Sequence, residues 1–134
     1  QSKVQKCYHA RTFGGPKEEE GIIDAPIARK PLPSLLREVS PEGKPSITRF
    51  RVLERAEKTA LLSLEPVTGR THQLRLHCAY MGFPILGDPQ YGSAESMAYS
   101  LERGIGTQLL CAKRLDFVHP VTGERMQLVS GLEV

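Results

Sequence analysis

Residues 65–92 read EPVTGRTHQLRLHCAYMGFPILGDPQYG, and they determine how the whole chain is interpreted. The stretch holds two arginines, two histidines and a Gly-Asp pair around a short apolar core. It lies between an expected strand and a Gly/Pro-rich loop. This number of polar side chains is larger than packing alone requires, and the stretch therefore predicts a functional site.

The middle of this stretch is expected to be helical. Residues 71–81 fit a strand at every second position and a helix at every third or fourth. Thr71 can cap a helix N-terminus through its hydroxyl, and Gly82 can end a helix. We therefore favour a helix over 71–81, and we expect a second helix over 93–103 that ends at Gly104.

Alternating side chains predict strands on either side of this stretch. Residues 45–57 place Phe50 on an apolar side and Arg49 and Arg51 on a basic side, as in a half-buried strand. Residues 59–64 follow a charged turn and complete an antiparallel hairpin. Elsewhere we expect strands over 4–13, 109–118 and 126–129, an edge strand over 22–27, and a long irregular loop over 30–45.

Length and composition limit the class of protein. With 134 residues, 40% hydrophobic and 25% charged, the chain is of single-domain size and ordinary composition. The expected elements predict an α+β fold with a mostly antiparallel sheet and two helices. No apolar run is long enough for a transmembrane helix, and the N-terminal QSKVQK lacks the apolar segment of a signal peptide. We expect a cytoplasmic protein in which Cys7, Cys78 and Cys111 are reduced thiols.

Three generic kinds of site can be considered. His72 and His77 are five residues apart, which turns their side chains about 140° apart on a helix, so they do not converge on a metal ion. Nothing around Cys78 or Cys111 indicates an activated thiol, although a Cys–His nucleophile pair stays open. The glycines of 82–92 are too widely spaced to cradle a phosphate.

Arg70 is the strongest candidate for ligand binding. Gly69 permits a tight turn before the expected helix, so the arginine is held near the helix N-terminus, where it can face a cleft. A guanidinium in that place can bind a carboxylate or a phosphate through two parallel hydrogen bonds. The alternative is an ordinary surface arginine beside a turn, and Gln73 would likewise ordinarily face solvent.

Two ordered motifs give the chain a family resemblance. Residues 68–77, TGRTHQLRLH, followed by G-x-P-I-x-G-D-x-x-Y over 82–91, resemble the signature of the RluA family of RNA pseudouridine synthases. The resemblance covers nearly the whole chain and implies part of a pseudouridine synthase catalytic domain. The other segments that agree are Lys6-x-Tyr8, 45–53 and a closing strand over 110–120, with Cys111 where the family usually has histidine.

The resemblance implies an isomerase that flips a uridine out of folded RNA, breaks its glycosidic bond, rotates the base and rejoins it through carbon. It implies no cofactor and no metal. By motif position, Tyr8 stacks on the flipped base and serves as a base, and Arg70 pairs with a nucleophilic aspartate. An aromatic ring suits an extruded base, and a guanidinium keeps a carboxylate ionised. The implied substrate-binding residues are Thr71, His72, Gln73 and Arg75.

The nucleophilic aspartate of the family has no match in this sequence. In the family it lies in a His-Arg-Leu-Asp-x-x-Thr-Ser-Gly motif upstream of the Lys-x-Tyr strand, where this sequence begins. Residues 114–116 read RLD, but Asp116 precedes Phe-Val-His-Pro of the closing strand and is expected to face outward. We therefore expect residues 1–134 to be the C-terminal portion of the catalytic domain, inactive by itself.

RNA, either ribosomal or transfer RNA, is the implied partner, and no membrane contact is expected. The net charge of +3 allows a polyanionic partner without requiring one. Exposed apolar edges predict self-association or association with the absent N-terminal portion. Two other classes stay open, namely a non-catalytic RNA-binding module of the same fold and a metabolic enzyme acting on another substrate. The basic residues that could contact phosphates, or be ordinary solvated charges, are Arg49, Arg51, Lys113 and Arg114.

Overall fold

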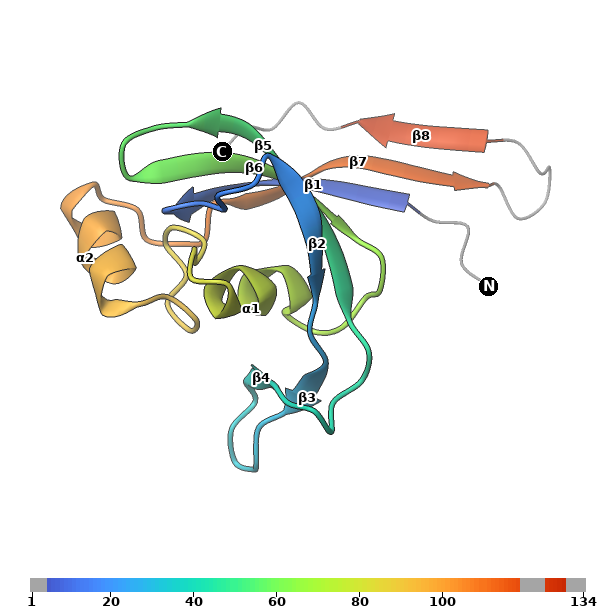
Figure 1. The fold of residues 1–134 in the computed structure, drawn as a ribbon, viewed down its shortest axis with the longest axis horizontal. Helices are drawn as coiled ribbons and strands as arrows, with labels where there is room; N and C mark the ends of the chain where they lie inside the picture. The colour runs from blue at the N-terminus through green and yellow to red at the C-terminus, as the bar shows by residue number, and fades with distance from the viewer. Residues whose placement is uncertain (1–4, 119–124, 130–134) are drawn as a thin grey trace.

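The computed structural model describes residues 5–118 and 125–129, which form an α+β fold as predicted. Six strands make one antiparallel sheet in the order β2-β5-β6-β1-β7-β8, and two short strands make a second sheet. Figure 1 shows α1 beneath the large sheet, the β3–β4 hairpin projecting below it, and α2 at one end. The elements are β1 Gln5–Phe13, β2 Glu20–Asp24, β3 Ile27–Arg29, β4 Arg37–Val39, β5 Ile47–Arg55, β6 Thr59–Pro66, α1 Gln73–Tyr80, α2 Ala94–Glu102, β7 Leu110–Val118 and β8 Arg125–Val129.

The β5–β6 hairpin confirms the alternation seen in the sequence. Thr48 and Phe50 are buried, whereas Arg49 and Arg51 are exposed on the opposite side of β5. Phe50 lies opposite Leu64 of β6, and both belong to the hydrophobic core. The hairpin therefore buries one face and leaves a basic face in solvent.

The central strand β1 pairs with β6 on one side and with β7 on the other. Its core residue Ala10 is fully buried, and Tyr8 packs against the core while staying partly exposed. The pairing with β7 shifts by one residue between Cys7 and Tyr8. A bulge of this kind bends a strand and redirects its side chains, and here it lies beside Tyr8.

Helix α1 covers the sheet and completes the core. Leu74 and Cys78 face inward, and they pack with Phe83 and Ile85 from the segment that follows. The helix ends before Gly82, which has a φ of 94° and so ends the helix as predicted. Burial raises the pKa of the Cys78 thiol to about 12.

The predicted start of this helix was wrong. The helix begins at Gln73, and its N-cap is His72 rather than Thr71. His72 has a φ of 58°, in the left-handed region, and its side chain does not cap the helix. The reason is a turn closed by the Gln73 N–H, which donates to the Arg70 carbonyl at 3.1 Å, so the helix cannot begin until this turn is complete.

The second helix agrees with the prediction and the proline-rich segment does not. Ser93 and Ser96 form a capping box at the start of α2, and Gly104, with a φ of 70°, follows its end. Within the expected irregular loop 30–45, β4 pairs with β3 to form a hairpin. Strands of three residues are too short to show a period in the sequence. Among the described residues, no helix is long and apolar enough to cross a membrane.

Candidate active site

A cleft of about 680 Å³ opens between β1, the turn after β6 and the start of α1. Tyr8 and Arg70, predicted from different motifs, both line it, and so does Lys6. Thr71, another predicted site residue, is exposed and does not line the cleft. The remaining predicted residues that line it are His72, Gln73 and Arg75.

The Arg70 guanidinium is held at the cleft by a backbone carbonyl. Its Nε and Nη2 donate to the Pro45 carbonyl at 3.1 and 2.9 Å. The backbone N–H of Arg70 donates to the side chain of Gln73 at 3.0 Å. No hydrogen bond from Nη1 occurs within the described part of the chain, so this group is available to a ligand. Pairing of Arg70 with a carboxylate stays a prediction.

Gln73 holds the turn that carries Arg70. Its Oε1 accepts from the Thr68 hydroxyl at 2.7 Å as well as from the Arg70 N–H. Its Nε2 donates to the Ile47 carbonyl at 2.9 Å and to the Thr48 hydroxyl at 3.0 Å. These four bonds use the full capacity of the amide. Gln73 therefore has a structural role here, and its contact with substrate stays a prediction.

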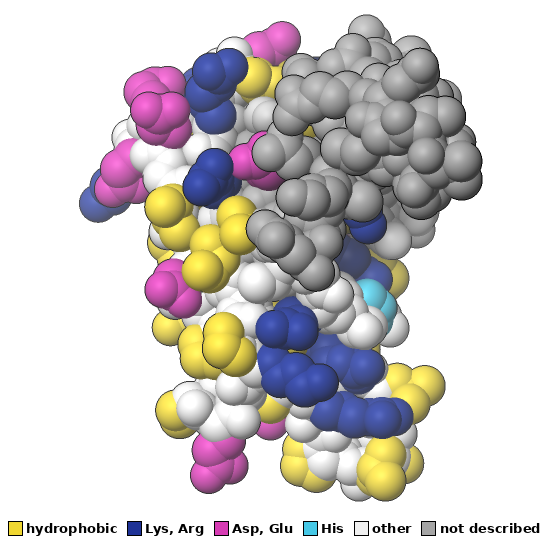
Figure 2. Space-filling view, turned by 90° about the vertical axis from the view of Figure 1, so that its right-hand side faces the viewer, with side chains coloured by type: hydrophobic (Ala, Val, Ile, Leu, Met, Phe, Trp, Pro, Cys, Tyr) yellow, Lys and Arg dark blue, Asp and Glu magenta, His cyan; other side chains and the backbone are white. Residues whose placement is uncertain are grey.

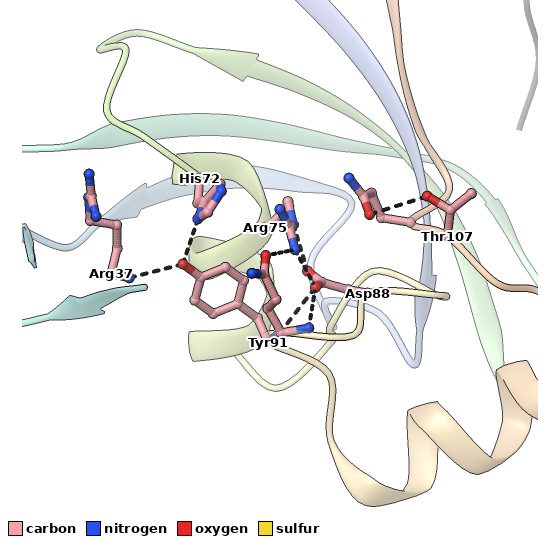
Figure 3. Close-up of polar contacts among 8 residues, drawn as sticks. Arg37, His72, Arg75, Asp88, Tyr91 and Thr107 are labelled. Carbon is pink, nitrogen blue, oxygen red and sulfur yellow. Dashed lines mark hydrogen bonds and ion pairs between the residues drawn. The ribbon is translucent and has the colours of Figure 1, made fainter. Parts of the chain in front are cut away.

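A buried ion pair lies beneath the cleft. Arg75 donates from Nε and Nη2 to the two oxygens of Asp88, at 3.0 and 2.7 Å, and the Asp88 side chain is 0% exposed. Burial alone would raise the pKa of Asp88, but hydrogen bonds from Arg75 and from the backbone N–H groups of Gln90 and Tyr91 lower it. Hydrogen bonding to Asp88 in turn raises the pKa of Arg75. The pair therefore fixes α1 to the loop that carries Tyr91 (Figure 3).

Tyr91 connects this loop to the cleft. Its hydroxyl lies 2.7 Å from Nδ1 of His72 and accepts the backbone N–H of Arg37 at 3.0 Å. Burial, together with the positive charges of Arg75 and Arg37, lowers the pKa of His72, so its imidazole is neutral at pH 7. No role for Tyr91 was predictable from the sequence, because its partners come from a hairpin and a turn whose positions only the fold reveals.

His77 lies in the core rather than in the cleft, and it does not converge with His72, as the helical spacing predicted. It is fully buried, with Nδ1 at 2.8 Å from the Thr48 hydroxyl and Nε2 at 2.9 Å from the Ala25 carbonyl. A carbonyl only accepts, so Nε2 carries the proton and Thr48 donates to Nδ1. Burial lowers the pKa of His77.

Basic side chains gather near the cleft. Figure 2 shows Lys and Arg side chains clustered on the lower half of one face, at the level of α1 and the β3–β4 hairpin, while most acidic side chains lie higher. Among the predicted phosphate-contacting residues, Arg49 is exposed and lies 3.5 Å from Glu65. The side chains of Arg114 and Asp116 lie outside the described residues, so the predicted orientation of Asp116 is not tested.

The fold and the sequence place the chain in a known class. Residues 1–80 match the model of the RNA pseudouridylate synthase family, and the chain belongs to this family. The human protein titled RNA Pseudouridylate Synthase Domain Containing 1 superposes with a TM-score of 0.82 at 29% identity, over 96% of this chain and 54% of that one. Human RNA Pseudouridylate Synthase Domain Containing 4 gives a TM-score of 0.73 at 28% identity, over 96% and 58%.

The curated relatives are longer than this chain. Ribosomal large subunit pseudouridine synthase C of Vibrio cholerae is 42% identical over 130 residues, which cover 97% of this chain and 41% of the relative. The protein of the same name from Salmonella typhimurium is 41% identical over 134 residues, covering 97% and 42%. The chain therefore spans about two fifths of the length of the curated relatives that it matches.

Proposed function

We propose that the protein carrying this chain isomerises uridine to pseudouridine in structured RNA, and that residues 1–134 form one wall of its active site. The observation that carries this proposal is the cleft that brings Tyr8 and Arg70 together in a member of the RNA pseudouridylate synthase family. The basic side chains that line the cleft are Lys6, Arg70 and Arg75. An extruded nucleotide needs both a stacking surface and nearby positive charge.

The reaction is an isomerisation whose atoms balance without a co-reactant. The bond from ribose C1′ to N1 of uracil breaks, a bond from C1′ to C5 forms, the C5 proton leaves, and N1 ends protonated. Tyr8 stacks on the base and accepts the C5 proton. Arg70 pairs with the nucleophilic carboxylate through Nη1, which makes no hydrogen bond among the described residues. This carboxylate belongs to a part of the protein outside residues 1–134, in line with the greater length of the relatives.

Large-subunit ribosomal RNA is the substrate that we propose first, because the relatives with the highest identities quoted above are named for that subunit. Transfer RNA is the second substrate to test. The β2 strand is one edge of the large sheet, and its Ile22 is 61% exposed. We propose that such edges contact the remaining portion of the catalytic domain, or a second copy where that portion is removed.

Tritium release from RNA labelled at C5 of uridine tests this function. The full-length protein should release tritium from large-subunit ribosomal RNA, whereas residues 1–134 alone should not. An Arg70→Gln variant of the full-length protein should be at least about 100-fold slower, since one lost transition-state donor costs about that much. Tight RNA binding without release would instead identify a non-catalytic RNA-binding module. Robust turnover by residues 1–134 alone would overturn the proposal that the nucleophile lies outside them.

A further inference from the structure

The Tyr91 hydroxyl joins two segments that are far apart in the sequence (Figure 3). The Arg37 backbone N–H, at 3.0 Å, can only donate, so the hydroxyl oxygen accepts from it. The hydroxyl proton then has one acceptor within the described part of the chain, which is Nδ1 of His72 at 2.7 Å. If Nδ1 donated instead, this proton would be left without an acceptor in a half-buried place, which is costly.

The protonation of His72 follows from this arrangement. A neutral imidazole that accepts at Nδ1 carries its proton on Nε2. Nearby charges favour the neutral form, since burial and the cations Arg75 and Arg37 lower the pKa of His72 and only Asp88 opposes them. No hydrogen bond reaches Nε2 among the described residues, and His72 is one of the residues that line the cleft. The Nε2–H is therefore a donor available to a ligand.

Tyr91 is itself held in place by the buried ion pair. Its backbone N–H donates to Oδ1 of Asp88 at 3.1 Å, and the Arg75 guanidinium lies 5.2 Å from the centre of its ring. The His72 and Tyr91 rings meet edge to face, with centroids 5.5 Å apart. A continuous series of contacts thus runs from Arg75 through Asp88 and Tyr91 to the imidazole of His72.

We infer that Tyr91 is a positioning residue, which fixes His72 as a neutral Nε2–H donor to an acceptor oxygen of the RNA in the cleft. The acceptor is either a uracil carbonyl or a phosphate oxygen. This inference deepens the proposed function and rests on it for the identity of the ligand. The tautomer of His72 does not depend on that function and is measured separately.

The first test is the ¹⁵N spectrum of the imidazole in the full-length protein without RNA. Long-range proton–nitrogen correlations should show His72 protonated at Nε2 and unprotonated at Nδ1 at neutral pH. In Tyr91→Phe the two tautomers should mix, whereas Tyr99→Phe should leave the spectrum of His72 unchanged. Tyr99 is the matched control because its ring packs against Phe13 and Arg103 and does not line the cleft. A proton on Nδ1 in the unmodified protein would overturn the inference.

The second test compares two replacements of His72 by kcat/KM for tritium release. Asparagine tolerates the left-handed conformation and places an acceptor near the position of Nδ1, so it keeps the contact with Tyr91 but loses the Nε2 donor. Glutamine places an amide nitrogen near the position of Nε2. His72→Asn should therefore be about tenfold slower than His72→Gln, the effect of one hydrogen bond. Equal rates, at equal melting temperatures, would overturn a donor role.

Binding to two RNAs that differ only in the target base distinguishes the acceptors. If His72 donates to the O4 carbonyl of uracil, which is an amino group in cytosine, His72→Asn should weaken binding to uridine-containing RNA and not to the same RNA with cytidine at the target. An equal loss for both RNAs would indicate a phosphate oxygen or the C2 carbonyl that the two bases share. The slope of affinity against salt should not change in either case, because a neutral donor releases no counterion, whereas Arg70→Gln should reduce it. Failure of the unmodified protein to release tritium, with the Nε2–H tautomer present, would refute the proposed function and leave the positioning by Tyr91 intact.

Discussion

His72 and His77 lie five residues apart in one motif, yet the fold uses them in opposite ways. Each has a hydroxyl beside Nδ1, from Tyr91 and Thr48 respectively, and burial lowers the pKa of each imidazole. The difference lies at Nε2. In His77 it donates to the Ala25 carbonyl inside the core, whereas in His72, a residue that lines the cleft, it makes no hydrogen bond among the described residues. A motif of polar residues is therefore not a uniform site, because some of its members hold the others in place.

The residues between the two histidines follow the same division. Gln73 forms hydrogen bonds within the turn before α1 and to β5, and Arg75 forms them to Asp88 in the loop that holds Tyr91. Changes on the core side should lower stability, and changes on the cleft side should lower activity at nearly constant stability.

The largest effect is expected at Asp88, which supports both the core side and the cleft side of the motif. In Asp88→Ala the Arg75 guanidinium stays buried without a carboxylate and keeps only its hydrogen bond to Oε1 of Gln90 at 2.7 Å, so the free energy of unfolding should fall by about 3–5 kcal/mol in urea. Activity should fall as well, because Tyr91 loses the acceptor of its backbone N–H. Asp88→Asn, which keeps an acceptor for that N–H, should lose less on both counts. A loss below about 1 kcal/mol in Asp88→Ala would show that the pair does not hold the loop.

Replacing His77 should lower stability more than replacing His72. His77→Ala leaves a cavity and removes the acceptor of the Thr48 hydroxyl proton and the donor to the Ala25 carbonyl, so we expect a loss of about 2–4 kcal/mol in urea unfolding. In His72→Asn the free energy of unfolding should stay within about 0.5 kcal/mol of that of the unmodified protein, because the His72 side chain is half-buried at the cleft. Similar losses in the two variants would remove the distinction between core and cleft.

The regular strands and α2 were predictable from the sequence for physical reasons. In β5, Thr48, Phe50 and Val52 alternate with exposed Arg49 and Arg51. Ser93 and Gly104 mark the two ends of α2 with residues that suit caps. The β3–β4 hairpin was missed because its strands are too short to show a period. The N-cap at His72 was missed because a left-handed residue there depends on the turn at Arg70 rather than on local preference.

The site was predictable as a set of residues but not as an arrangement. The family resemblance indicated Tyr8 and Arg70, and the structure brings both to one cleft. It gave Arg75 no partner, although Asp88 of opposite charge lies within the same two motifs. The role of Tyr91 could not be predicted, because its hydroxyl contacts Arg37 across the fold, from a segment expected to be irregular.

The left-handed backbone conformation of His72 should affect stability independently of its side chain, by a smaller amount. Its φ of 58° is costly for β-branched residues and free for glycine. His72→Val should therefore lose about 1–2 kcal/mol of unfolding free energy relative to His72→Gly, although both lack the imidazole. Equal stability of the two variants would indicate that the turn relaxes to an ordinary conformation when the histidine is absent.

The smallest effect is expected from acid, which adds a proton and removes no atom. The pKa of His77 is lowered below its ordinary value of 6.5, so the unfolded chain binds the proton first and stability falls as the pH drops below that value. In His77→Gln the stability should therefore decrease less than in the unmodified protein as the pH is lowered from about 7 to about 5. Asp88 is protonated only below this range. The effect should be smaller in His72→Gln, because the half-buried ring of His72 is less desolvated. Thermal unfolding at each pH measures this loss of stability in both variants. A larger reduction of this loss in His72→Gln than in His77→Gln would show that the histidine at the cleft, not the one in the core, is the more strongly desolvated.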